Sequence, residues 1–244
     1  MNLILDIGNT SAKVYAYDNG KAVDEMHFDK HNVYMLNVFC SKYAFTQGIY
    51  STVVNLPDDL EHALANMPFK MMKLVSDKTP LPIKNMYETP STLGTDRLAA
   101  AVGAYMKSPG SDVLVIDIGT CVTYDFVKST GEYLGGNISP GVTMRLKALK
   151  MFTDRLPLVD RHGDKTEIGT NTEYAIRNGV LLGMEYEING YISKYSSKYP
   201  NLLIYLTGGV KLDLHISKKS GIFADKFIVP DGLNRILEYN NESF

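Results

Sequence analysis

Two short motifs in this chain combine a carboxylate, a glycine and a hydroxyl side chain. The first is Asp6-Ile-Gly-Asn-Thr10, and Asp117-Ile-Gly-Thr120 repeats it in the second half of the chain. A glycine in a turn lets the backbone approach a ligand closely, and the exposed N–H groups of such a turn can bind phosphate oxygens. Asp6, at the end of an apolar strand-like run, can hold Mg²⁺ directly or through water. These features indicate a phosphate site.

Polar side chains around the first motif fit the same chemistry. Asn9 and Thr10 can form hydrogen bonds, and Lys13 offers a mobile cation for developing phosphate charge. A single Asp-x-Gly is compatible with an ordinary solvated turn, but the second copy and Thr207-Gly-Gly209 favour a ligand site. The sequence has no Walker motif, no Gly-x-Gly-x-x-Gly opening a helix and no Gly-x-Ser-x-Gly. P-loop, dinucleotide-binding and serine hydrolase chemistry are therefore disfavoured.

A third motif, Gly94-Thr-Asp-Arg97, puts an acid and a base at the start of an expected helix, with Tyr87 upstream. One interpretation is structural: Thr95 is the N-cap and Asp96 complements the helix dipole. Arg97 does not fit that interpretation, because a cation in the first turn opposes the dipole. The misfit favours a functional site in which Arg97 faces an anion.

Two further spacings leave less to conclude. His27 and His31 lie four residues apart, but their segment is typical of a strand running into a turn and lacks a third ligand, so no zinc site is predicted. Gly179 and Gly183 form a notch on an expected long helix. That notch fits close packing within the chain and a dimer contact equally well.

Composition limits the class of protein. The chain has 244 residues, 45% of them hydrophobic, with 25 Lys+Arg against 27 Asp+Glu, which is typical of a globular protein. A net charge of −2 gives no basic field that would attract nucleic acid or an anionic membrane. No apolar stretch reaches the length of a membrane helix, and Cys40 and Cys121 lack the spacing of a disulfide framework. We therefore expect a cytoplasmic protein that binds neither nucleic acid nor membrane.

The elements that must position these motifs form two similar lobes. Each aspartate motif stands between two β-rich runs, and turn signals at Asp18-Asn-Gly20 and Ser129-Thr-Gly131 precede a third strand. Strand–helix alternation follows, with helices expected near residues 32–41, after Pro57, after Pro140-Gly141, over about 171–198 and after Pro230-Asp231. The pattern predicts an α/β protein with mixed sheets in two duplicated lobes, residues 1–107 and 108–244.

The ordered motifs resemble those of the type III pantothenate kinases, a branch of the acetate and sugar kinase, actin and chaperone ATPase superfamily. The resemblance runs the length of the chain. Its carriers, in order, are residues 6–13, Tyr87 with Gly94-Thr-Asp-Arg97, Asp117-Ile-Gly-Thr120, Gly135-Gly-Asn-Ile-Ser-Pro-Gly141, Asn171-Thr172 with Ala175-Ile176, and Thr207-Gly-Gly209. Cys121 and Thr95 depart from the residues usual in the family, and neither change removes a functional group.

The resemblance implies two actin-like lobes with the nucleotide cleft between them. It also implies ATP-dependent phosphorylation of pantothenate to 4'-phosphopantothenate, the first step of coenzyme A biosynthesis. It further implies a cytoplasmic homodimer that needs Mg²⁺ and a monovalent cation, K⁺ or NH₄⁺. Asp96 would be the general base, Asp117 would bind the monovalent cation and Asp6 the Mg²⁺. ATP phosphates would lie on Asp6, Ile7, Gly8, Asn9, Thr10, Ser11, Ala12, Lys13 and Thr120, and pantothenate on Tyr87, Gly94, Thr95, Asp96, Arg97 and Thr172.

Two alternatives stay open at this point. A regulator or interaction protein could keep the two lobes without turnover, since a fold does not fix a function. Retention of Asp6, Asp96, Arg97 and Asp117 argues against it. A small sugar or N-acetylhexosamine kinase of the same superfamily is the second alternative, and the Gly94–Arg97 motif with Tyr87 disfavours it.

Overall fold

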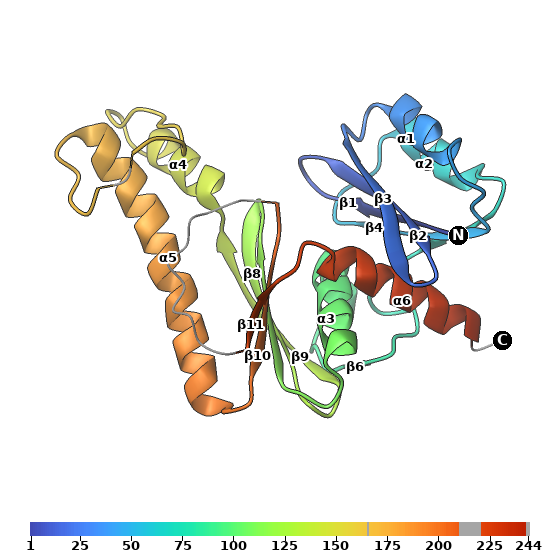
Figure 1. The fold of residues 1–244 in the computed structure, drawn as a ribbon. Helices are drawn as coiled ribbons and strands as arrows, with labels where there is room; N and C mark the ends of the chain where they lie inside the picture. Colours follow the sequence, from blue (N-terminus) through green and yellow to red (C-terminus); the bar gives the residue numbers. More distant parts are fainter. Residues whose placement is uncertain (165, 210–220, 243–244) are drawn as a thin grey trace.

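Two sheets lie side by side, with a pair of helices between them (Figure 1). The structure is a computed structural model that describes residues 1–164, 166–209 and 221–242. Among these residues no helix is long and apolar enough to cross a membrane.

The first sheet has five strands in the order β3-β2-β1-β4-β5. An antiparallel meander of β1, β2 and β3 is extended by β4 and β5, which run parallel to β1. Helices α1 and α2 cover one face, and the aliphatic and aromatic side chains between them and the sheet form one core. The bounds are β1 Asn2–Ile7, β2 Ala12–Asp18, β3 Lys21–Phe28, α1 Val33–Cys40, β4 Gln47–Thr52, α2 Asp58–Ala65 and β5 Lys70–Lys73.

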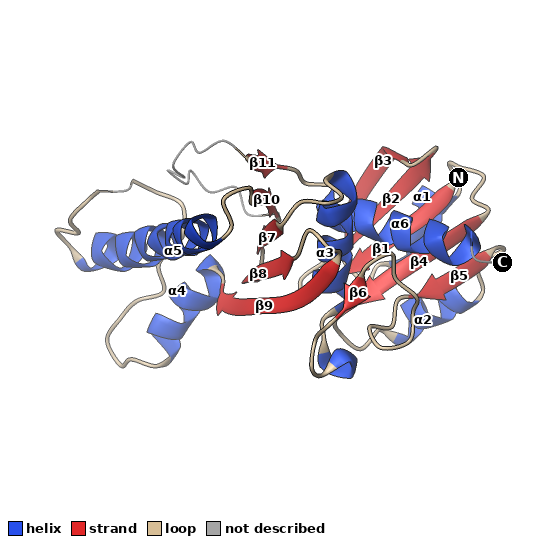
Figure 2. Cartoon of the chain, turned by 90° about the horizontal axis from the view of Figure 1, so that it is seen from below, coloured by secondary structure: helices blue, strands red, loops and turns tan. Residues whose placement is uncertain are grey.

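The second sheet has six strands in the order β11-β10-β7-β8-β9-β6 and repeats the meander as β7, β8 and β9. It lies between α5 with α4 on one side and α3 on the other (Figure 2). The bounds are β6 Lys84–Asn85, β7 Val113–Ile118, β8 Cys121–Val127, β9 Glu132–Pro140, α4 Val142–Met151, α5 Thr172–Lys198, β10 Leu203–Thr207 and β11 Ile222–Ala224, with a short 3₁₀ helix at Pro90–Thr92.

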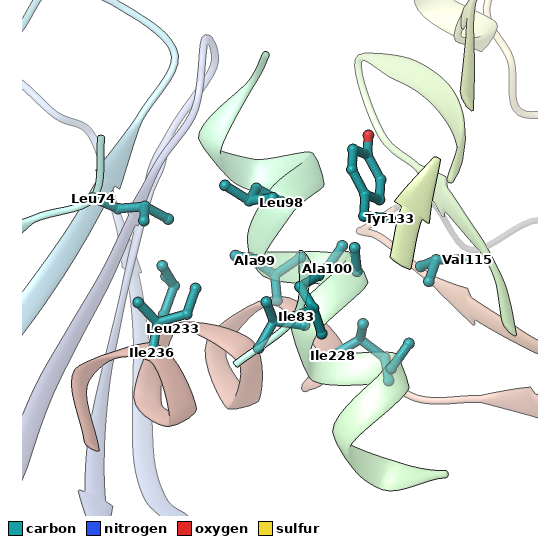
Figure 3. Close-up of a cluster of buried hydrophobic side chains, with 14 of the residues drawn as sticks. Leu74, Ile83, Leu98, Ala99, Ala100, Val115, Tyr133, Ile228, Leu233 and Ile236 are labelled. Atoms are coloured by element: carbon teal, nitrogen blue, oxygen red, sulfur yellow. The ribbon is translucent and has the colours of Figure 1, made fainter. Parts of the chain in front are cut away.

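Helices α3 (Thr95–Lys107) and α6 (Ile228–Glu242) form the layer between the sheets. They cross at glycines: a Cβ on Gly103 would lie 1.9 Å from the Ile228 carbonyl oxygen, and one on Gly232 would lie 1.9 Å from that of Ala99. Figure 3 shows Val115 and Tyr133 of the second sheet and Leu74 of the first lobe, just after β5, beside this pair. Ile4 and Ile49 of the first sheet belong to the same core. The central core therefore ties the two lobes together.

The predicted α/β architecture of two duplicated lobes is confirmed, and both meanders lie where the sequence placed them. The last helix begins at Ile228, before Pro230 rather than after it. Proline is tolerated there because the N–H groups of a first turn have no acceptor within the helix. The boundary at residues 107/108 stays a prediction, and two elements cross it: β6 joins the second sheet, and α6 contacts the first through Asn234.

Candidate active site

The two aspartate motifs meet across the gap between the sheets. Each occupies a tight connection between antiparallel strands, closed by a backbone hydrogen bond from Gly8 to Ser11 (3.1 Å) and from Gly119 to Cys121 (2.9 Å). Thr10 Oγ1 and Thr120 Oγ1 lie 3.4 Å apart. The fold therefore brings together two hydroxyl-bearing turns that are far apart in the sequence, as expected for a shared phosphate site.

Asp6 and Asp117 are the next-to-last residues of β1 and β7. Burial raises the pKa of Asp6 to about 6 and that of Asp117 to about 7, the charge of Asp96 raises both further, and the charge of Lys13 opposes both shifts. Three carboxylates from distant parts of the chain thus influence one another, and the charge of Lys13 acts on two of them. Such a cluster is suited to binding cations and phosphate together.

The turn after β10 completes this side of the site. Thr207 stands opposite Asp117 in the parallel pairing of β10 with β7. Gly208 has φ +112°, and a Cβ there would lie 2.2 Å from the Ile118 carbonyl oxygen and 2.7 Å from Asp117 Oδ1. Only glycine fits this approach. The expected nucleotide-side turn thus lies against the second aspartate motif, while the residues that follow, 210–220, lie outside the described part of the chain.

Asp96 occupies the first turn of α3. The helix begins at Thr95 with Gly94 as N-cap, so the interpretation of Thr95 as N-cap is wrong. Thr95 Oγ1 instead lies 2.9 Å from Ser51 Oγ and donates to the Thr52 carbonyl oxygen (3.2 Å) at the end of β4. Burial raises the pKa of Asp96, although its carboxylate accepts the Arg97 backbone N–H at 2.8 Å. The helix start is thereby fixed to the first sheet.

Arg97 faces a carboxylate of the protein itself. Its Nε and Nη2 donate to Asp125 Oδ1 at 3.0 and 2.6 Å, and the arginine is only 5% exposed. The guanidinium carbon also lies 5.8 Å from the centroid of the Tyr87 ring. The sequence interpretation did not include Asp125, whose one signal is an acidic residue within the apolar strand β8. The expected contact of Arg97 with an external anion stays a prediction.

A cavity of about 960 Å³ opens beside these residues. All members of the predicted pantothenate set except Thr172 line it, and so do Asn9 and Cys121 from the two turns. One wall of the cavity was not predicted from the sequence. The first part of this wall directly follows β4, and crevices at the carboxyl ends of parallel strands are common ligand sites. That wall comprises residues 52–55 and 73–76.

Thr172 does not line this cavity. It is exposed at the start of α5, where the Asn171 side chain accepts the Tyr174 N–H at 2.9 Å as an N-cap. It lines a separate, largely apolar groove of about 800 Å³ between α4 and α5. A Cβ on Gly179 or Gly183 would meet no atom within 4 Å among the described residues, so packing within the described part of the chain does not explain the notch.

Comparisons with known proteins agree with this geometry. The family model of the type III pantothenate kinases matches residues 2–194. A type III pantothenate kinase from Phocaeicola vulgatus is 50% identical over 242 residues, covering 99% of this chain and 100% of that protein.

Solved structures support the fold alone. A Campylobacter jejuni protein assigned to the Baf family of transcriptional activators has a TM-score of 0.60 at 21% identity, over 98% of this chain and 99% of that one. A polyphosphate/ATP-glucomannokinase from an Arthrobacter species has a TM-score of 0.50 at 12% identity, over 99% and 100%. The two-lobe fold is thus shared with a sugar kinase. On its sequence, from end to end, the chain belongs to the type III pantothenate kinase family.

Proposed function

We propose that this protein transfers the γ-phosphoryl group of ATP to the primary hydroxyl of pantothenate, giving 4'-phosphopantothenate, the first step towards coenzyme A. The observation that carries the proposal is the placement of Asp96: it lines a cavity shared with both phosphate turns and interacts electrostatically with Asp6 and Asp117. The name of the full-length relative at 50% identity supports pantothenate as the acceptor.

The ATP phosphates would lie on the turn of residues 6–13 and on Thr120. The meeting of Thr10 with Thr120 supports this, because one phosphate chain could accept hydrogen bonds from both lobes. Asp6 would hold Mg²⁺ with phosphate oxygens and water, a ligand set that magnesium prefers and that a single partly buried carboxylate suits. Bound there, the metal would neutralise charge on the phosphates, while Lys13 would stabilise charge that develops during transfer.

Asp96 would act as the general base. Its carboxylate accepts the proton of the pantothenate hydroxyl while the oxygen forms a bond to the γ-phosphorus and ADP leaves with the electron pair of the broken P–O bond. Burial favours this role because it raises the pKa of Asp96 and so strengthens it as a proton acceptor. The Thr95 contacts with Ser51 and Thr52 would keep the carboxylate in place.

The rest of the pantothenate site would be formed by Tyr87, Gly94, Thr95 and Arg97, which surround Asp96 in the cavity. Asp117 would bind a monovalent cation, K⁺ or NH₄⁺. Its partly buried carboxylate, beside the sharply bent turn of Gly208, offers oxygen ligands, the kind that hard cations take.

A homodimer would complete the site. Thr172 is remote from the cavity of its own chain, so it would reach pantothenate bound to the other subunit. The surface around it is apolar and open, with Met151, Phe152 and Ile168 exposed by 74%, 80% and 76%. Exposed apolar patches of this kind mark protein contacts. We place the enzyme in the cytoplasm, where ATP is available.

Pantothenate-dependent release of ADP tests the proposal. Purified protein with MgATP and KCl should release ADP when pantothenate is added and should form 4'-phosphopantothenate by mass spectrometry. Glucose and N-acetylmannosamine serve as alternative acceptors. A folded protein that releases no ADP with pantothenate would overturn the proposal, and turnover only with a sugar would favour a sugar kinase of the same fold.

A further inference from the structure

Asp125 is a buried carboxylate for which the proposed reaction gives no role. It lies on β8 with 0% exposure and accepts hydrogen bonds from three donors. Arg97 Nε donates to Oδ1 (3.0 Å) and Oδ2 (3.3 Å), and Arg97 Nη2 (2.6 Å) and the Tyr133 hydroxyl (2.8 Å) donate to Oδ1. Tyr133 on β9 is itself fully buried. A buried charge is strongly unfavourable unless it is paired and hydrogen-bonded, and here three donors satisfy one carboxylate.

The pairing joins the substrate motif to the second sheet. Arg97 belongs to α3, in the layer between the lobes, whereas Asp125 and Tyr133 belong to neighbouring strands of the second sheet. A two-point contact between a guanidinium and a carboxylate fixes the plane of the arginine as well as its position. The orientation of Arg97 at the cavity wall is therefore set by two residues that do not line the cavity.

Aromatic contacts extend the same support to Tyr87. Its ring lies 6.3 Å from the Tyr133 ring, centroid to centroid, and 5.8 Å from the guanidinium carbon of Arg97. Figure 3 shows Tyr133 at the edge of the central hydrophobic cluster, with its hydroxyl directed away from that cluster. The phenol therefore joins an apolar core to a charged pair.

We propose that Asp125 and Tyr133 are positioning residues that hold Arg97 and Tyr87 in the orientation that receives the acceptor substrate. The inference rests on the proposed function, because Arg97 and Tyr87 belong to the proposed pantothenate site. In this proposal the second sheet holds the residues that bind the acceptor substrate. The first sheet, through Ser51 and Thr52, holds the start of the helix that carries the general base.

Tyr133→Phe tests the proposal with the smallest change. It removes one hydroxyl from Asp125 and keeps the ring. We expect the KM for pantothenate to rise about fivefold, because Asp125 loses one of its three donors and then holds the Arg97 guanidinium less firmly. The KM for ATP should stay within twofold. Tyr124→Phe is the matched control, since Tyr124 is equally buried on β8 and donates to a carboxylate, Glu187, at 2.7 Å, outside the cavity.

A double-mutant cycle separates positioning from general stability. Asp125→Asn should raise the KM for pantothenate at least tenfold, because Arg97 loses its charged partner. In an Arg97→Gln background the same change should have no further effect, since no guanidinium remains to be positioned. The pair of amides leaves no uncompensated buried charge in the double variant. If Asp125→Asn alone fails to fold, Tyr133→Phe with its Tyr124→Phe control still tests the proposal.

Three results overturn the positioning role. They are an unchanged pantothenate KM in Tyr133→Phe, equal effects of Tyr133→Phe and Tyr124→Phe, and an independent effect of Asp125→Asn in the Arg97→Gln background. A loss of folded protein alone would lower kcat and leave both KM values unchanged, so it cannot imitate the expected result. If wild-type protein shows no turnover with pantothenate, the proposed function fails instead, and the two failures are thereby distinguished.

Discussion

The two lobes begin with the same strand–turn–strand unit, yet they surround their aspartates differently. In the first lobe Asp6 stands opposite Lys13 in the pairing of β1 with β2. In the second lobe Asp117 stands opposite Thr123 in the pairing of β7 with β8. Only the first aspartate therefore has a cation of the protein at the equivalent position of its own hairpin.

The charge of Lys13 nevertheless acts on both aspartates. Burial raises both pKa values, but the pKa of Asp6 rises to about 6 and that of Asp117 to about 7, and in each case Lys13 is the next contribution and lowers the value. One lysine in the first lobe thus serves two carboxylates. The comparison teaches that the two copies of a duplicated unit can differ through one cross-strand residue. The lysine of the first copy fits the proposed phosphate and Mg²⁺ site, and its absence from the second copy fits the proposed monovalent-cation site.

The largest effect is expected from replacing Asp96, whose carboxylate lies between the two strand–turn–strand units. Asp96→Asn should lower kcat about 10²–10⁴-fold, the usual contribution of a positioned general base, and leave the fold intact. Steady-state kinetics and circular dichroism measure the two. A loss below tenfold would show that Asp96 only complements the α3 dipole.

Replacing Asp117 and replacing Asp6 should impair the reaction in different ways. Asp117→Asn should abolish the stimulation by K⁺ over Na⁺ and lower kcat by about 10–100-fold, because a fixed cation then no longer stabilises the developing charge. Asp6→Asn should mainly weaken MgATP and keep the response to K⁺. Rates measured in KCl and NaCl over a range of MgATP concentrations distinguish them. If wild-type protein works equally well in both salts, the monovalent site is wrongly assigned.

The comparison also predicts how stability depends on pH in protein without metal. Carboxylates with a folded pKa near 6 or 7 bind more protons in the folded than in the unfolded state above about pH 4. The free energy of unfolding should therefore fall as pH rises from about 4 to 7 and level off above.

Asp117→Asn should remove much of that slope and increase stability at pH 8 by about 2–4 kcal/mol. Urea unfolding in acetate buffer at pH 5 and in Tris buffer at pH 8, both free of K⁺ and Mg²⁺, measures it. Asp154→Asn, at an exposed carboxylate, is the control. Equal stability of wild type and Asp117→Asn at both pH values contradicts the prediction.

The smallest effect is expected at the crossing of α3 and α6, which holds the two lobes together. Gly103→Ala should destabilise the protein by about 1–3 kcal/mol, because its Cβ would overlap the Ile228 carbonyl oxygen on α6. Gly190→Ala on α5, where a Cβ meets nothing within 4 Å among the described residues, should instead be neutral or stabilising by up to about 1 kcal/mol. Thermal unfolding of both variants compares them. Similar changes in Tm would mean that the crossing does not hold the lobes.

The sequence predicted most of the local structure for identifiable reasons. The apolar runs before Asp6 and Asp117, with glycine turns after them, are local signals, and both hairpins formed where they indicated. It placed the start of α6 too late, because a proline indicates a helix start without fixing which residue of the first turn it occupies. Asp125 was missed for a different reason: a charge within a strand says nothing about its partner.

The sequence by itself determined the family, the two meanders and the residue types of the phosphate turns, since all of these are encoded over short stretches of the chain. Only the tertiary structure decided which groups meet: Thr10 with Thr120, Arg97 with Asp125, and Thr95 with the end of β4. It also separated Thr172 from the cavity of its own chain. The physical reason is that such contacts depend on how two helices and two sheets pack, and packing is the sum of many contacts distributed over the whole chain.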